Sequence, residues 1–178
     1  MVQNQILHAA LARYDLTQSK TRLLGSLWNE TYHVETPSMQ YSLRICPAVI
    51  QNPKMQEDEM VWLEFVANQG GVQIPRPVRN QLGEFVSSIE IDEGRRLCCL
   101  FEWIEGRPIQ SELTPSRMHK IGQAVAKLHV MGKAFQFPSA DNDFRSGYHY
   151  DQAIIKEHLE WVVVHEARIG PERVALLR

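Results

Sequence analysis

Residues 41–46 read Tyr-Ser-Leu-Arg-Ile-Cys, and residues 54–69 form the next periodic stretch of the chain. Side chains of a strand alternate between its two faces, so the aliphatic residues of 41–46 point to one side and Arg44 to the other. In 54–69 apolar residues recur at helical spacing, with Glu59 on the same face. Arg44 is thus a cation on one face of a predicted strand, and Glu59 is a carboxylate on the apolar face of the helix that follows.

The sequence on both sides of residues 41–69 predicts further strands and helices. Turn residues and alternating apolar positions predict further strands before and after the helix, and 74–78, with two prolines, must be extended. Asp92-Glu93-Gly94 is expected to be a three-residue hairpin loop. The predicted strands are 21–27, 31–36, 41–46, 85–91 and 96–104, and the predicted helices are 5–14 and 54–69, with Met55, Glu59, Trp62, Leu63 and Val66 on one face of the latter.

From residue 106 onward the pattern is helical only. Thr114 is a predicted N-cap with Pro115 at the first helical position, and the apolar stripe that follows ends near Gly132. Asp151 is predicted to cap another helix, and a last one runs into Arg178, so the chain looks cut within a periodic segment. We expect an α+β unit over 1–105 and the start of an incomplete helical unit over 106–178.

Composition excludes several classes of function. The 178 residues carry a net charge of −2 with no basic stripe, which argues against nucleic-acid binding. No run approaches the ~20 apolar residues of a membrane span, and no signal peptide is evident. Cys98 and Cys99 are adjacent on a predicted strand and point to opposite faces, so a disulfide between them is not expected. A reducing, cytoplasmic location fits best.

Six segments in one order carry a resemblance to the aminoglycoside phosphotransferase and choline kinase-like family of small-molecule kinases, in particular its homoserine-kinase-like branch. No single segment is specific, and the order over residues 20 to 130 is what matters. The segments are Leu24-Gly25-Ser26-Leu27-Trp28-Asn29-Glu30-Thr31-Tyr32, Tyr41-Ser42-Leu43-Arg44-Ile45, Glu59-Met60-Val61-Trp62-Leu63, Ile74-Pro75-Arg76-Pro77-Val78, Leu100-Phe101-Glu102-Trp103-Ile104-Glu105-Gly106 and Ala126-Lys127-Leu128-His129.

This resemblance implies a protein-kinase-like amino lobe, an antiparallel sheet of about five strands with one inserted helix, followed by the first helices of a truncated helical lobe. It also implies ATP and Mg²⁺ as cofactors of the intact family and transfer of the γ-phosphoryl group to a hydroxyl of a metabolite or an aminoglycoside-like antibiotic. Gly25, Ser26 and Asn29 would lie in the loop over the nucleotide phosphates. The alternative is a hairpin glycine and a turn asparagine, since the loop has one glycine only.

Arg44 takes the place of the third-strand lysine that contacts the α- and β-phosphates, and Glu59 the place of its helical carboxylate partner. The alternatives are a solvent-facing strand residue and an exposed charge. Phe101 to Ile104 resembles the hinge between the lobes, where the Glu102 carbonyl and the Ile104 N–H would read adenine. Trp103 is either part of this hinge or a packing residue.

The catalytic centre of the family is missing from these 178 residues. The family uses an H-x-D-x-x-x-x-N loop and a later aspartate on Mg²⁺. His149-Tyr150-Asp151 has the first part of this pattern, but Lys156 stands where asparagine is required, and no aspartate follows Asp151. His158 and His165 with Glu166 do not make a zinc site. No catalytic residue and no metal ligand is therefore assigned, and the chain alone is expected to be inactive.

Other interpretations remain open at this point. The chain could be a non-catalytic module that binds nucleotide weakly, associates with itself or binds a partner that covers its helices. It could also be the product of a truncated gene, or an unrelated α+β domain. The phosphoryl acceptor cannot be named, because the helical lobe selects it in this family.

Overall fold

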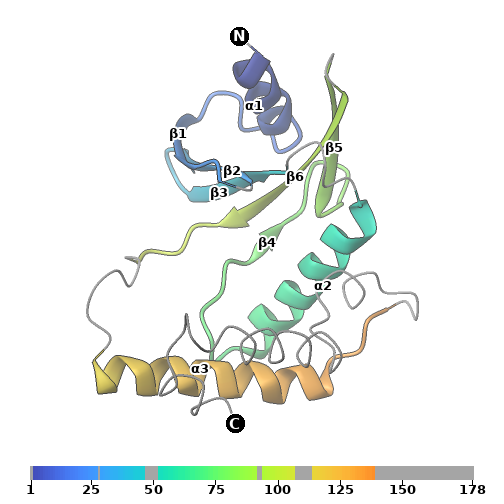
Figure 1. Ribbon diagram of the computed structural model, residues 1–178. Helices are drawn as coiled ribbons and strands as arrows, with labels where there is room; N and C mark the ends of the chain where they lie inside the picture. The colour runs from blue at the N-terminus through green and yellow to red at the C-terminus, as the bar shows by residue number, and fades with distance from the viewer. Residues whose placement is uncertain (1, 28, 47–51, 92–93, 107–113, 139–178) are drawn as a thin grey trace, which may run out of the picture. The chain divides into compact units, whose positions relative to one another are not determined.

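A computed structural model of the chain describes residues 2–27, 29–46, 52–91, 94–106 and 114–138. All of them belong to one compact unit, Met1–Phe144. The elements in chain order, labelled in Figure 1, are α1 (Val2–Ala12), β1 (Lys20–Gly25), β2 (Glu30–Glu35), β3 (Gln40–Ile45), α2 (Pro53–Gln69), β4 (Pro77–Val78), β5 (Val86–Ile91), β6 (Gly94–Glu102) and α3 (Pro115–Ala134).

The strands form one antiparallel sheet of six strands in the order β1-β2-β3-β6-β4. Strand β6 is central, because β3 pairs with one of its edges while β5 and then β4 pair with the other. The two-residue β4 lies in the extended, proline-containing segment and is the strand that the sequence pattern did not predict. The expected α+β class, with one helix inserted into the sheet sequence, is confirmed.

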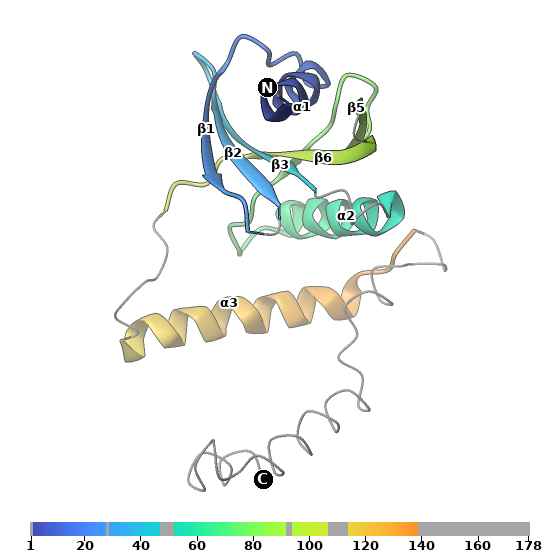
Figure 2. The ribbon, with the colours of Figure 1, turned by 45° about the horizontal axis from the view of Figure 1, so that its top comes forward.

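The sheet has two covered faces with different helices on them (Figures 1 and 2). One face packs apolar side chains of β2, β3, β5 and β6 against α1. On the other face, Met60 of α2 belongs to a second apolar cluster with residues of β5 and β6. Cys98 belongs to the first cluster and Cys99 to the second, and both are free thiols, so the prediction that they point to opposite faces is confirmed.

Helix α2 begins as its sequence indicates, and part of its predicted apolar stripe packs against the sheet. The side chain of Asn52 caps it by accepting from the Met55 N–H, and Pro53 follows. Of the predicted stripe, Val66 is buried, Leu63 packs against the second apolar cluster and Glu59 reaches Arg44. The other buried residues of α2 are Gln56, Asp58 and Met60. Hydropathy did not reveal the burial of Gln56 and Asp58, because these polar side chains have partners of their own, Arg44 and Lys54.

The first residues of β6 and of α3 can be compared with the boundaries predicted from the sequence. Gly94 pairs with Ile91 as the first residue of β6 and has a φ of 110°, so it does not end a three-residue loop as expected. This φ lies in the left-handed region that glycine adopts without strain. Helix α3 confirms the prediction at its start, since the Thr114 hydroxyl accepts from the Arg117 N–H and Pro115 follows.

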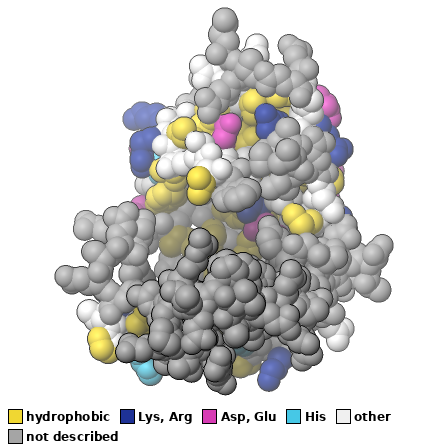
Figure 3. Space-filling model, in the orientation of Figure 1, with side chains coloured by type: hydrophobic (Ala, Val, Ile, Leu, Met, Phe, Trp, Pro, Cys, Tyr) yellow, Lys and Arg dark blue, Asp and Glu magenta, His cyan; other side chains and the backbone are white. Residues whose placement is uncertain are grey.

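The described surface is mixed in charge. On the face drawn in Figure 3, the described Lys and Arg side chains are interspersed with Asp and Glu side chains. A search of the described helices found none with the length and apolarity to cross a membrane. The predicted helices after residue 150 lie outside the described residues, and the division at residues 105 and 106 stays a prediction.

Candidate functional site

Arg44 and Glu59 meet as the sequence predicts. Arg44 Nη1 donates to Glu59 Oε1 and Arg44 Nη2 donates to Glu59 Oε2, both at 2.8 Å. The pair joins the end of β3 to the second turn of α2, and its side chains are 19% and 28% exposed. Such a two-bond arginine–carboxylate contact fixes both position and orientation of the guanidinium.

A second acceptor on α2 holds the same guanidinium, and the sequence analysis missed it. Arg44 Nη2 also donates to Gln56 Oε1 at 2.9 Å, and the Arg44 guanidinium carbon lies 5.1 Å from the centre of the Phe101 ring. Gln56 is three residues before Glu59, so helical spacing puts both on neighbouring positions of one helix face. The spacing of three residues between Gln56 and Glu59 is the sequence signal from which Gln56 could have been predicted as a second acceptor. A guanidinium has five N–H groups, so two remain after these three bonds, and one of the two, the Nε–H, is buried without a hydrogen-bond partner.

The electrostatics keep this arginine charged. Burial acts to lower the pKa of Arg44, but the hydrogen bonds and the charge of Glu59 raise it, and the net pKa is above the ordinary value. Two thiols lie on the same face of the sheet. Burial raises the pKa of Cys99 to about 12 and also raises the pKa of Cys46, although the Arg44 charge opposes both shifts. The site thus presents one permanent cation beside neutral thiols.

The predicted phosphate loop lies between β1 and β2. Gly25 ends β1, Ser26 follows it, and the ladder shifts register between Leu23 and Gly25. A Cβ placed on Gly25 would meet no atom within 4 Å. The Oδ1 atom of Asn29 is buried and has no hydrogen-bond partner in the structure. Packing within the described part of the chain therefore does not explain why a glycine stands at position 25 or an asparagine at position 29.

The predicted hinge continues β6 past the sheet. The Glu102 N–H donates to the Arg76 carbonyl at 2.9 Å, and the Trp103 N–H donates to the Gln40 carbonyl at 3.1 Å. Ile104 follows and is half-buried. Here the end of β6 is held between β3 and the segment that leads into β4.

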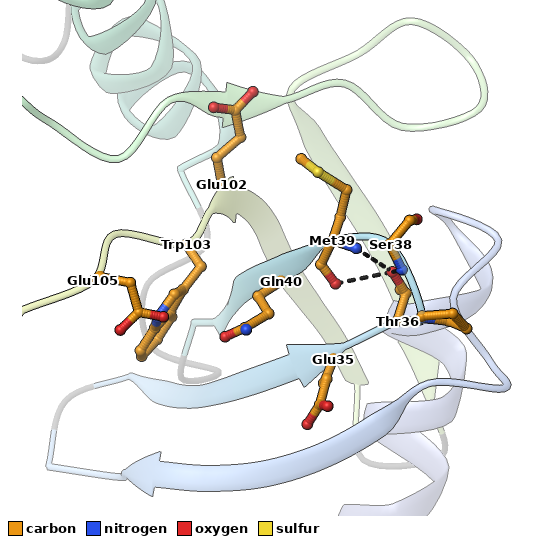
Figure 4. Close-up of a pocket in the computed structure, with 9 residues that line it drawn as sticks. Glu35, Thr36, Ser38, Met39, Gln40, Glu102, Trp103 and Glu105 are labelled. Atoms are coloured by element: carbon orange, nitrogen blue, oxygen red, sulfur yellow. Dashed lines mark hydrogen bonds between the residues drawn. The ribbon is translucent and has the colours of Figure 1, made fainter.

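A pocket of about 410 Å³ opens where this hinge meets the turn between β2 and β3 (Figure 4). Thr36 builds the turn, because its hydroxyl donates to the Met39 carbonyl at 2.8 Å and accepts from the Met39 N–H at 2.9 Å. The residues that line the pocket are Glu35, Thr36, Pro37, Ser38, Met39, Gln40, Glu102, Trp103 and Glu105.

Potential metal-ligating side chains do not gather in the described part of the chain. Within the described ranges, no group of three His, Cys, Asp or Glu side chains is arranged to hold a metal ion. The segment His149-Tyr150-Asp151, Lys156 and the pair His158 and His165 lie outside those ranges. Their roles stay predictions.

Comparison with known proteins shows the family. The profile of the phosphotransferase enzyme family matches residues 20–163, which is most of the chain. The chain therefore belongs to the phosphotransferase enzyme family. Amicoumacin kinase of Bacillus subtilis (strain 168) is 23% identical over 136 residues, which make up 75% of this chain and 40% of that protein.

Solved structures agree on the fold. The microcompartment-associated aminopropanol kinase matches with a TM-score of 0.70 and 26% identity, over 83% of this chain and 45% of that one. Amicoumacin kinase hAmiN, in complex with AMP-PNP, Ca²⁺ and Ami, matches with a TM-score of 0.65 and 18% identity, over 92% of this chain and 54% of that one. The predicted kinase-like fold is confirmed, and the chain spans about half the length of these relatives.

Proposed function

We propose that this chain forms the nucleotide-binding part of an ATP-dependent small-molecule phosphotransferase. In the intact protein the γ-phosphoryl group of ATP passes to a hydroxyl of a metabolite or an aminoglycoside-like compound. Gly25, Ser26 and Asn29 approach the phosphates, Arg44 binds them, Glu59 holds Arg44, and the backbone of Glu102 and Ile104 meets the base.

One observation carries this proposal. The Arg44 guanidinium is fixed by two bonds to Glu59 and one to Gln56, and these bonds leave one Nη1–H, while its Nε–H is buried. A preorganised cation on a sheet face is what binding of phosphate oxygens requires, since phosphoryl transfer depends on positioning and charge. The open space at Gly25 adds support, because a backbone without a Cβ lets phosphate oxygens come close to N–H groups.

The resemblance also implies a divalent cation as a cofactor of the intact protein. Mg²⁺ would neutralise charge on the β- and γ-phosphates, and it prefers carboxylate oxygens and water. The described residues provide no carboxylate cluster for it. We therefore assign no metal ligand to this part of the chain, and binding of ATP by Arg44 and the loop does not depend on such a ligand.

The test is calorimetric titration of the 178-residue chain with ATP. We expect weak binding, and Arg44→Ala should weaken it by more than about tenfold, because a charged hydrogen bond is worth ~1.5–3 kcal/mol. Arg79→Ala is the matched control, since Arg79 also pairs with a glutamate of α2, Glu64, at 3.2 Å. Equal ATP affinity of wild type and Arg44→Ala would mean that the phosphate assignment is wrong.

Turnover is the second measurement. With Mg²⁺ and a panel of hydroxyl acceptors, the chain alone should release no ADP above the background, because these residues include no H-x-D-x-x-x-x-N sequence. Specific ADP release by the purified chain would contradict this expectation while leaving the nucleotide site in place.

A further inference from the structure

Gln56 of α2 is a buried polar side chain that meets two donors from the sheet side. Its Oε1 accepts from Arg44 Nη2 at 2.9 Å and from the Cys46 thiol at 3.5 Å. The residue is only 5% exposed. An amide carbonyl has two lone pairs, and here both neighbours are donors, so the carbonyl and not the NH2 group of Gln56 faces Arg44.

The two side chains of α2 that hold Arg44 differ in how firmly the rest of the fold holds them. The Glu59 side chain is 28% exposed, and its two bonds fix the carboxylate and the guanidinium to each other, so the two can move as one unit. Gln56 also contacts Cys46, which is 1% exposed and whose backbone N–H donates to the Leu97 carbonyl at 2.8 Å. The bond to Gln56 therefore ties the guanidinium to the sheet as well as to α2.

These bonds decide which N–H of Arg44 is left for a ligand. Both N–H groups of Nη2 are used, one on Glu59 Oε2 and one on Gln56 Oε1. Nη1 uses one N–H on Glu59 Oε1, and the Nε–H is buried without a partner among the described residues. The second Nη1–H remains. In a planar guanidinium it points from the edge opposite the one that Gln56 occupies.

We propose that Gln56 is a positioning residue, which holds Nη2 of Arg44 so that the second Nη1–H is the one donor directed at an anion. Arg44 then contacts one phosphate oxygen through one N–H, in a fixed direction. The inference rests on the proposed binding of phosphate and adds to it the residue that sets the geometry of the contact.

The arrangement suits arginine and not lysine at position 44. A guanidinium spreads its donors over separate edges of a rigid plane, so Glu59, Gln56 and an anion can each take their own edge. The three donors of an ammonium share one atom, and two acceptors on α2 would compete with the anion for them. Gln56 and Arg44 therefore act as a unit.

A merely structural role for Gln56 leads to different expectations. In that case the amide only satisfies a buried donor, and its loss lowers stability without a specific effect on anion binding. Asp58 provides the matched control, because it lies on the same helix, is 2% exposed and has its ion pair with Lys54. Asp58→Asn disturbs a buried polar contact of α2 that does not involve Arg44.

The experiment is calorimetric titration of the 178-residue chain with inorganic triphosphate. Gln56→Met, similar in length but without an acceptor oxygen, should weaken binding by roughly three- to tenfold, the range that one uncharged hydrogen bond corresponds to. Asp58→Asn should bind as wild type does. Gln56→Asn keeps an amide that is one methylene shorter, and it should show the same loss if Gln56→Met does not fold.

A double-mutant cycle tests whether Gln56 acts through Arg44. In an Arg44→Lys background, Gln56→Met should have no further effect on triphosphate affinity, because no guanidinium is left to orient. Equal or tighter binding by Gln56→Met in the wild-type background would overturn the positioning role. So would the same loss in the Arg44→Lys background, or an equal loss in Asp58→Asn.

A measurement without ligand separates this inference from the phosphate assignment. The side-chain nitrogen NMR signals of Arg44 are assigned by their absence in Arg44→Lys, and the Nη2 signal should shift and broaden in Gln56→Met. If that signal changes but triphosphate affinity does not depend on Arg44, the phosphate assignment fails and Gln56 still orients the guanidinium. If affinity depends on Arg44 but neither the signal nor the affinity changes in Gln56→Met, the phosphate site stands and the positioning role is wrong.

Discussion

Arg44 shows how a single residue ties two elements together. Its guanidinium donates to both carboxylate oxygens of Glu59 and to the amide oxygen of Gln56, all on α2. Burial acts to lower the pKa of Arg44, but the hydrogen bonds and charge of Glu59 raise it above the ordinary value, so the guanidinium stays charged. An ion pair of this kind is costly to break from one side only, because the remaining charge loses its partner.

Glu59→Gln should therefore destabilise the fold by roughly 1–2 kcal/mol, less than the ~3–5 kcal/mol of a fully buried pair, since both side chains keep some exposure. Urea unfolding followed by circular dichroism gives the midpoint. Glu64→Gln is the control, because the Arg79–Glu64 pair is 50% and 36% exposed and should be worth less than ~1 kcal/mol. Equal midpoint shifts for the two variants would contradict this account.

Strand β6 is the element that connects the two cores. It pairs with β3, β4 and β5, and it sends Cys98 to the α1 side and Cys99 to the α2 side. Burial raises the pKa of each thiol to about 12. Both thiols are therefore neutral in the folded chain at pH values at which they ionise in the unfolded chain, where the pKa is about 8.5.

This difference predicts a loss of stability in alkali. A raised folded pKa gives stability that is complete below the unfolded pKa and decreases as pH rises from about 8.5 toward 12, by up to ~1.4 kcal/mol per pH unit for each thiol. Urea unfolding between pH 7.5 and 10 should show this slope. The double variant Cys98→Ala, Cys99→Ala starts less stable but should show a flatter slope, and an unchanged slope would exclude the thiols as its cause.

At the scale of the whole molecule, few of the described residues pack against α3. This 20-residue helix has no buried side chain, and Met118, Val125 and Val130 are 47%, 44% and 68% exposed. It contacts α2 near its end, where Phe135 packs on Trp62 and Phe65. Apolar side chains exposed along one helix favour association with another surface.

We expect the 178-residue chain to self-associate with increasing concentration, as measured by light scattering. The double variant Met118→Lys, Val125→Lys should shift the mass toward that of a monomer without loss of helicity. Leu82→Lys is the control, because Leu82 is equally apolar, 74% exposed and located in a turn outside α3. A monomer at all concentrations with low binding of a hydrophobic dye would show that α3 is not an associating surface.

The sequence by itself determined the order of the elements, the two-sided placement of Cys98 and Cys99, and the meeting of Arg44 with Glu59. The first two depend on strand alternation, turns and helix caps, which are local properties of the chain, whereas the third was implied by the family resemblance that the order of the segments carries.

Only the tertiary structure decided that Gln56 and Asp58 of α2 are buried, that Gln56 shares Arg44 with Glu59, and that Trp103 reaches His33. Each of these depends on how elements distant in sequence pack. A polar side chain such as Gln56 is buried when a partner from another element satisfies it, and hydropathy along the chain carries no record of that partner.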